Sequence, residues 1–132
     1  MAHIEEQQSL SLDEPVLVEG LPGVGLVGKL AADHLVEALD MEYYAACHCE
    51  GLPDVAVYEA GERGVRPPVR MYADEGRDLL VLQSDVPVSP SAAEEFATCI
   101  TGWLAEQDAL PLYLSGLAEE KDGVPDLYGI AT

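Results

Sequence analysis

The chain has 132 residues, 48% of them hydrophobic, and it carries 25 acidic against 6 basic side chains, for a net charge of −19. Its length and apolar content predict one folded domain over residues 1–132, and the negative charge argues against nucleic acid or an anionic membrane as a partner. No apolar run is long enough to cross a membrane, and the polar, acidic first 15 residues resemble no secretory signal or transit peptide, so we expect a cytoplasmic protein.

The first half of the chain predicts a strand, a helix and then three strands. Residues 15–20 (PVLVEG) form a short apolar strand, and after a glycine-rich turn the apolar residues of 26–39 recur at helical spacing. Residues 41–49 (MEYYAACHC) and 55–59 (VAVYE) have the composition of strands. A further strand in 65–73 (VRPPVRMYA) begins irregularly, because its two prolines cannot donate ladder hydrogen bonds.

The second half predicts a central strand followed by a second helix. Residues 78–84 (DLLVLQS) are continuously apolar, as in a strand covered on both faces. The helix begins either at Ser89 before a proline or at a capping box of Ser91 and Glu94, and it runs to about residue 107.

The remaining segments complete the predicted sheet. Residues 111–116 (PLYLSG) form another buried strand, 117–126 a polar loop, and 127–132 the start of a further strand. Strands and helices in this order predict an α/β domain of three layers, in which helices cover both faces of a mixed β-sheet.

Residues 19–30 (EGLPGVGLVGKL) match two nucleotide-binding patterns. Gly-x-Gly-x-x-Gly at Gly23, Gly25 and Gly28 is a dinucleotide fingerprint, and the overlapping Gly-x-x-x-x-Gly-Lys resembles a P-loop. The first lacks the further βα units of a dinucleotide fold, and the second has Leu30 where a hydroxyl would hold Mg²⁺. We therefore interpret the glycines as allowing a sharp turn and close packing between the strand and the helix. The exposed N-terminus of that helix could still bind an anion.

The histidines and cysteines offer no metal or catalytic site from the sequence. In a strand, Cys47 and Cys49 share one face and His48 takes the other, so the three cannot chelate one ion. Cys99 alone does not complete a tetrahedral site, and we interpret the thiols as small buried side chains. His34 lies on the apolar stripe of the first helix, which is more typical of a core or interface histidine than of a catalytic base.

Polar residues follow three of the predicted strands. Glu19 ends the first, Asp85 follows 78–84, and Ser115 lies at the end of 111–116. Because ligands of α/β sheets bind at the carboxyl ends of strands, these residues define a candidate crevice. The other interpretation is that Asp85 and the serines cap turns, and the lack of a histidine placed to act with them favours it.

Four segments carry a resemblance to a known family: VLVEGLPGVGLVGKLAADHLVEAL, LPDVAVYEAGERGVRPPVRMYA, DLLVLQSDVPVSPSAAEEFATCITGWLAEQ and LYLSGLA. In this order they resemble the archaeal branch of the proteasome assembly chaperone 2 family. The first segment is the most specific, through Glu19, Gly20, Pro22, Gly23, Gly25 and Gly28. The resemblance implies a fold like that of phosphorylase and hydrolase domains, without an established catalytic centre. Members are near twice this length, so the chain resembles their N-terminal part.

The resemblance also implies a role as an ATP-independent chaperone that helps assemble the 20S proteasome through protein–protein contacts. It implies no catalytic residue, cofactor or metal ligand, and it points to proteasome subunits as partners. Some members dock a C-terminal hydrophobic-Tyr-x tail, whereas here Leu127-Tyr128-Gly129 is not terminal. The alternative is an enzyme or a small-ligand or nucleotide binder, ATP-grasp-like or hydrolase-like, that uses the crevice near Glu19, Gly23 and Asp85.

Two further expectations come from the distribution of charged and apolar residues. The acidic residues are scattered along the chain, which indicates adaptation to a salt-rich, halophilic cytoplasm where screening removes their repulsion. The strand at 41–49 has apolar side chains on both faces, and two helices cannot cover the whole sheet, so we expect an exposed apolar surface and a homo-oligomer. Strict alternation would place Met41, Tyr43, Ala45 and Cys47 on one face and Tyr44 and Ala46 on the other.

Overall fold

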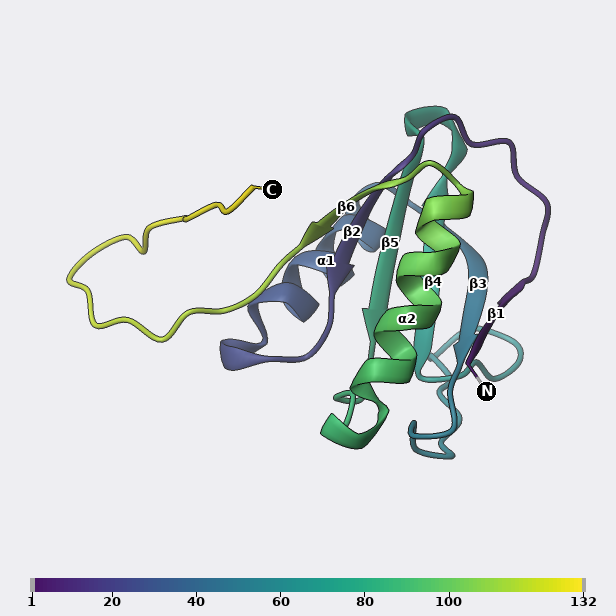
Figure 1. Cartoon of the computed structure of the whole chain (residues 1–132), viewed down its shortest axis with the longest axis horizontal. Coiled ribbons are helices and arrows are strands. Elements are labelled where there is room, and N and C mark those ends of the chain that lie inside the picture. Colours follow the sequence, from purple (N-terminus) through teal and green to yellow (C-terminus); the bar gives the residue numbers. More distant parts are fainter. Residues whose placement is uncertain (1, 132) are drawn as a thin grey trace.

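The computed structural model describes residues 2–131 and shows a mixed six-stranded sheet between two helices (Figure 1). The strands are β1 (His3–Glu6), β2 (Val16–Gly20), β3 (Glu42–His48), β4 (Val69–Asp74), β5 (Leu79–Ser84) and β6 (Leu110–Tyr113). The helices are α1 (Val27–Ala38) and α2 (Pro90–Glu106), with short 3-10 turns η1 (Val24–Leu26) and η2 (Glu75–Arg77). The predicted three-layer α/β class is confirmed. Within residues 2–131, no helix has both the length and the apolar character to span a membrane.

The strands lie in the order β1-β3-β4-β5-β2-β6, with β1 and β6 at the two edges. β2 runs parallel to β5 and β6, whereas β1–β3, β3–β4 and β4–β5 are antiparallel pairs. Gly20 is paired with Gln83, so the carboxyl ends of β2 and β5 lie side by side. The chain leaves β2 toward α1 and leaves β5 toward α2, on opposite faces of the sheet, which is the arrangement that favours ligand sites in α/β folds.

The larger core lies between α2 and the sheet. Alternate residues of the central strands, such as Leu17, Leu80 and Leu82, are fully buried against the apolar stripe of α2. That stripe, which includes Phe96 and Ile100, recurs at helical spacing, as the sequence predicts. Ser89 is the N-cap residue and Pro90 occupies the first turn, so the helix begins at the first of the two predicted caps, although the Ser89 side chain makes no capping hydrogen bond.

The smaller core lies between α1 and the opposite face of the sheet. Val18, Tyr72 and Val81 pack there against Ala32 of α1. Because Leu17 and Val18 are successive residues of β2, they point to opposite faces, and the whole strand is covered on both sides.

A β-bulge in β3 changes which of its side chains share a face. The register of β3 against β4 shifts between Tyr43 and Ala45. Tyr44 therefore joins Ala45 and Cys47 in the core under α2, while Tyr43 packs in the core under α1. The strict alternation expected for 41–49 is wrong, because Met41 and Tyr43 pack on the α1 side whereas Ala45 and Cys47 pack on the α2 side together with Tyr44. The strand is also well buried, so the exposed apolar surface that we expected there lies elsewhere on the molecule.

Three predictions about strands are wrong. Residues 55–59 form no strand; Val57 makes only an isolated bridge to Arg66, because β1 and β4 already occupy both sides of β3. Residues 111–116 were expected to be a buried strand, but β6 is a short edge strand with exposed side chains. Residues 127–131 have no regular structure, and Thr132 lies outside the described residues. β1 was not expected, because its sequence is short and polar.

Candidate functional site

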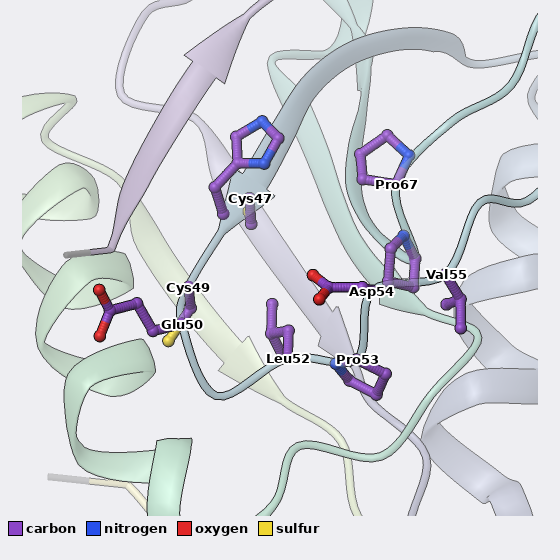
Figure 2. A pocket seen from close by; sticks show the side chains of 10 residues that line it. Cys47, Cys49, Glu50, Leu52, Pro53, Asp54, Val55 and Pro67 are labelled. Atoms are coloured by element: carbon purple, nitrogen blue, oxygen red, sulfur yellow. The ribbon is translucent and has the colours of Figure 1, made fainter.

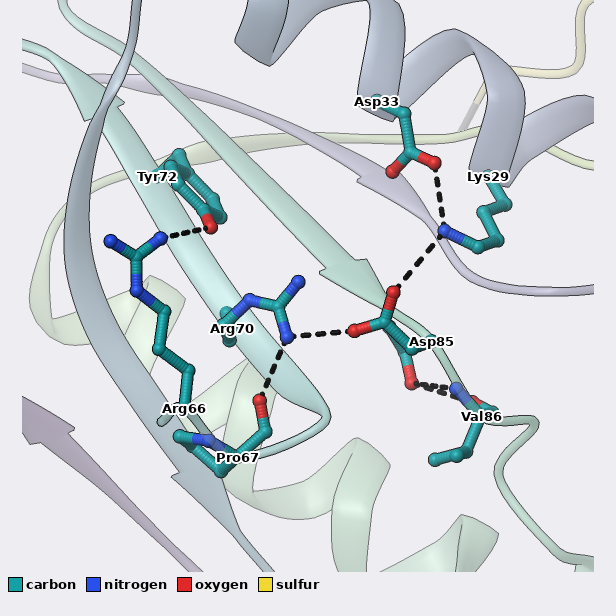
Figure 3. A network of polar contacts seen from close by, with 9 residues as sticks. Lys29, Asp33, Arg66, Pro67, Arg70, Tyr72, Asp85 and Val86 are labelled. Atoms are coloured by element: carbon teal, nitrogen blue, oxygen red, sulfur yellow. Dashed lines mark hydrogen bonds and ion pairs between the residues drawn. The ribbon is translucent and has the colours of Figure 1, made fainter. Parts of the chain in front are cut away.

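Polar side chains meet at the carboxyl end of β5, on the α1 side of the sheet (Figure 3). One carboxylate oxygen of Asp85, just after β5, lies 2.7 Å from a guanidinium nitrogen of Arg70 on β4. The other lies 3.5 Å from the ammonium of Lys29 on α1. Lys29 in turn lies 2.7 Å from the carboxylate of Asp33, one helical turn further along α1. We call Lys29, Asp33, Arg70 and Asp85 the polar cluster.

Arg70 is the buried centre of this cluster, with only 2% of its side chain exposed. It also donates to the carbonyl of Pro67 at 2.9 Å, while its Nε has no hydrogen-bond partner within residues 2–131. Burial alone would lower the pKa of Arg70, but Tyr72 and Asp85 outweigh burial, so the pKa is raised and the side chain stays charged. With its amide turned to suit both neighbours, Gln83 accepts from Arg70 at 3.1 Å and donates to Asp33 at 2.8 Å.

The charges of the polar cluster compensate one another, because it contains two cations and two carboxylates. Lys29 contacts both carboxylates, so it is not free to hold a nucleotide phosphate as a P-loop lysine does. Leu30, at the position of the missing hydroxyl, is an apolar side chain that is 62% exposed. The arrangement fixes α1 to the end of the sheet and gives no support to a phosphate site.

Glu19 does not share this site, because it lies on the α2 side of the sheet. It lines a largely apolar hollow of about 290 Å³ with Phe96 and Ile100 of α2 and Tyr113 of β6. Burial raises the pKa of the Glu19 carboxyl, and a hydrogen bond with the backbone of Leu21 partly offsets this effect. The crevice expected near Glu19, Gly23 and Asp85 is thus divided in two by the sheet.

The glycines between β2 and α1 have different structural roles. A Cβ atom on Gly20 would stand 2.5 Å from the Cβ of Ala32 and would overlap the carbonyl of Gly28, so only glycine lets the helix approach the strand. Gly25 has a φ of 65°, in the region that favours glycine. Gly23 has open space around its Cα and an extended backbone, and Pro22 beside it is half-buried. These contacts support the structural interpretation of the glycine motif.

A second hollow, of about 310 Å³, lies where β3 ends (Figure 2). Cys47 and Cys49 line it together with the prolines of the loop before β4. Burial raises the pKa of the Cys47 thiol to about 12, and the nearby Cys99 adds to the effect, so Cys47 is a neutral, unreactive side chain. His48 also lines this hollow, and its Nε2 lies 3.1 Å from a carboxylate oxygen of Glu5 on β1. His34 is exposed on α1, so it is not the core histidine that we considered.

An exposed apolar surface covers the end of the sheet that carries β6. Its residues come from η1, the first turn of α1, β6 and the chain that follows, and each is at least 47% exposed: Val24, Leu26, Val27, Leu30, Leu110, Leu112, Tyr113 and Leu117. The η1 residues and the residues that follow β6 are neighbours, because Gly116 lies directly against the carbonyl of Val24. We call this surface the apolar edge. Sequence reasoning missed it because 111–116 has the composition of a buried strand.

A sequence model described as the PAC2 family matches residues 17–132, which is most of the chain. An uncharacterized protein of Methanocaldococcus jannaschii is 32% identical over 85 residues, a stretch that covers 64% of this chain and 34% of that protein.

Two solved structures of Pyrococcus furiosus proteins have the same fold. PbaA, described as an archaeal homolog of proteasome-assembly chaperone, superposes with a TM-score of 0.75 at 26% identity, over 91% of this chain and 52% of PbaA. PbaB, described as an archaeal proteasome activator, gives 0.73 at 26% identity, over 92% of this chain and 54% of PbaB. The chain therefore spans about half the length of these structural relatives.

Proposed function

The chain belongs to the PAC2 family, and from this premise we propose that it acts as a proteasome-assembly-chaperone-like protein, through protein–protein contacts and without ATP. Its likeness to PbaA supports the chaperone role, since that protein is described as a homolog of a proteasome-assembly chaperone. We further propose, as the family resemblance implies, that residues 1–132 are the N-terminal domain of a longer protein.

The observation that carries the proposal is the apolar edge. Leu110 and Leu112 stand on the strand at the edge of the sheet, where the backbone groups on the outer side of β6 have no neighbouring strand among residues 2–131. An edge strand with exposed apolar side chains is a surface that a partner chain can extend or cover. The apolar edge supports a binding function better than either hollow, because the hollow at Glu19 is largely apolar and the Cys47 thiol of the other hollow is buried and neutral.

The partners that we propose are the α subunits of the 20S proteasome, with homo-oligomers as the free form. To test this, the full-length protein with an affinity tag is expressed in its host and purified in molar KCl. Proteasome α subunits should copurify with it, and fewer assembled 20S particles should form in a strain that lacks the protein. If the α subunits do not copurify and assembly is unchanged, the proposal is wrong. If only the peptidase activity of finished particles responds, the protein is an activator, as PbaB is described to be.

The polar cluster supports the proposed independence from ATP, because it engages Lys29. Calorimetry with Mg-ATP in molar KCl should show no saturable heat. A micromolar, Mg²⁺-dependent dissociation constant would instead support the enzyme or nucleotide-binding alternative.

We also propose that the protein works in the salt-rich cytoplasm of a halophile. Its net charge of −19 opposes folding by self-repulsion in dilute buffer, and molar salt shortens the screening length to roughly 3 Å. The Tm should rise steeply between low and molar KCl. A Tm that does not change with KCl would remove the halophilic explanation.

A further inference from the structure

Two histidines and a glutamate meet on one face of the β1–β3 pair. His3 lies directly opposite His48 in the antiparallel register, and Glu5 is two residues further along β1, so the three side chains share a face. Nε2 of His48 lies 3.1 Å from a carboxylate oxygen of Glu5. The two imidazole rings stack with their centroids 4.9 Å apart.

The donor atoms of these side chains are already at the spacing of metal ligands. One atom from each of the three lies within 4.8 Å of the other two. Zinc holds imidazole nitrogen and carboxylate oxygen at about 2.0–2.2 Å, so adjacent ligand atoms of a tetrahedral site stand roughly 3.4 Å apart. The Glu5–His48 separation is near this value without any change. His3 and Glu5 are exposed, so small rotations of their side chains meet no packing resistance.

We propose that His3, Glu5 and His48 form a site for a divalent transition-metal ion, with Zn²⁺ as the ion that fits it best. Two imidazoles and one carboxylate suit Zn²⁺ and its neighbours in the first transition row, whereas Mg²⁺ and Ca²⁺ prefer oxygen ligands alone. Three protein ligands leave a fourth position for water or for a side chain of a partner protein.

The cysteines near this site do not compete for the ion. Cys47 is buried under α2, on the face of β3 opposite to His48. Cys49 packs against the same core, two residues further along. The metal would therefore be held by nitrogen and oxygen ligands only.

A metal at this position would link the first strand of the chain to β3. Because the ligands come from residues 3, 5 and 48, the complete site exists only when β1 is paired. An ion that binds only the folded state raises its stability in proportion to the logarithm of the free ion concentration. Zn²⁺ should therefore raise the Tm.

The test measures Zn²⁺ binding by calorimetry on the full chain without a histidine tag. Molar KCl and excess Mg²⁺ suppress loose binding to the many acidic side chains. The unmodified protein should bind one Zn²⁺ saturably, with a Tm that rises in Zn²⁺ and falls again in EDTA. His48→Asn and Glu5→Gln should each weaken binding at least about tenfold, because even outer-shell changes cost metal sites 10–100-fold. His34→Asn, which removes the remaining, exposed histidine, should bind as the unmodified protein does.

Substitution with Co²⁺ gives a second readout that does not depend on stability. The visible d–d bands should show nitrogen and oxygen ligation, the near-ultraviolet spectrum should lack a thiolate charge-transfer band, and His48→Asn should abolish the d–d bands. The proposal is wrong if the protein binds no Zn²⁺, or if Glu5→Gln and His48→Asn bind as tightly as His34→Asn. A thiolate band would also overturn it, because the cysteines would then be the ligands.

Discussion

The two edges of the sheet are each formed by a four-residue strand, but they present opposite surfaces. β1 exposes His3, Glu5 and Glu6, whereas β6 exposes Leu110, Leu112 and Tyr113. Charged side chains on an edge strand discourage another chain from pairing with it, and apolar ones invite it. The β1 edge is protected, while the β6 edge is available for association.

The comparison shows that the exposure of an edge strand does not by itself indicate a binding surface. The types of the exposed side chains must be considered as well. Both strands have the same pattern of burial, with one half-buried residue among three exposed ones. The difference is in the side chains, which are charged or polar on β1 and apolar on β6. Four changes to the sequence would break or sharpen the contrast between the two edges.

The largest effect is expected from adding a positive charge to β6. Leu112→Lys should weaken capture of proteasome α subunits, or self-association, at least about tenfold, since the loss of a central, well-packed interface side chain costs about 2 kcal/mol or more. Gln7→Lys makes the same change of charge next to β1, where Gln7 is exposed and only its backbone amide bonds to β3. Pull-down and light scattering in molar KCl measure both. Equal losses in the two variants would show that the edges do not differ.

The next effect concerns the packing that holds β2 beneath α1, next to the β6 edge. Gly20→Ala should lower the stability by about 3 kcal/mol, since the new Cβ would overlap Gly28 and Ala32. The Tm should fall by roughly 10 °C, measured by circular dichroism. Gly23→Ala should be neutral or slightly stabilising, because nothing lies near its Cα and its backbone is extended. A large loss at Gly23 would mean that the motif constrains more than packing.

A smaller effect is expected in the polar cluster between the edges. Arg70→Met should cost about 2 kcal/mol, less than the 3–5 typical of a fully buried pair, because Asp85 is 33% exposed and keeps its contact with Lys29. Arg77→Met removes an ion pair with Asp74 whose arginine is 60% exposed, and it should cost under about 0.5 kcal/mol. Urea denaturation compares the two. If Arg70→Met is as mild as Arg77→Met, the cluster does not hold the sheet and α1 together.

The smallest effect is a pH dependence at Glu19, which is paired with Tyr113 of β6. The pKa of Glu19 is raised by burial, so its charged form destabilises the fold. The neutral Glu19 carboxyl contributes its full stability at pH values below the pKa that Glu19 has in the unfolded chain. This contribution is lost as the pH rises through the higher pKa that Glu19 has in the folded protein. Glu19→Gln should therefore raise the Tm slightly at pH 7, and the difference should shrink as the pH falls toward 4. Glu37→Gln, at an exposed site on α1, corrects for the change in net charge. An equal Tm shift in both variants would rule out a burial effect.

The central elements could be predicted from local patterns, because each one has a clear signal of its own. The continuous apolar run of β5 predicts its central place, and the helical periods of α1 and α2 predict their lengths to within a few residues. The edge strands could not be recognised in the same way. β1 is too short and too polar to be recognised as a strand. Residues 55–59 could form a strand only beside a strand with an unpaired edge, and the local sequence does not show whether such an edge is available.

The candidate site was only partly accessible from the sequence. Asp85 was identified from its place after a strand. Its partner Arg70 was not identified, because no pattern in the sequence of β4 indicates a buried charge. The side of the sheet on which Glu19 lies could have been predicted from alternation along β2. Leu17 and Glu19 are two residues apart and share one face, whereas Val18 lies on the other. The bulge in β3 had no such signal, since it depends on pairing with β4.

β1 has a kinetic consequence, because it pairs with the sheet on one side only, through β3. Terminal strands of this kind open in sub-global fluctuations that cost less than complete unfolding, so their amides exchange early with solvent. When β1 detaches, the backbone of β3 at Ala45, Ala46 and Cys47 is uncovered, in a segment with no charged side chain. The transient state then has an aggregation-prone strand at each end. We therefore expect the pairing of β1 to protect the protein from aggregation at high concentration.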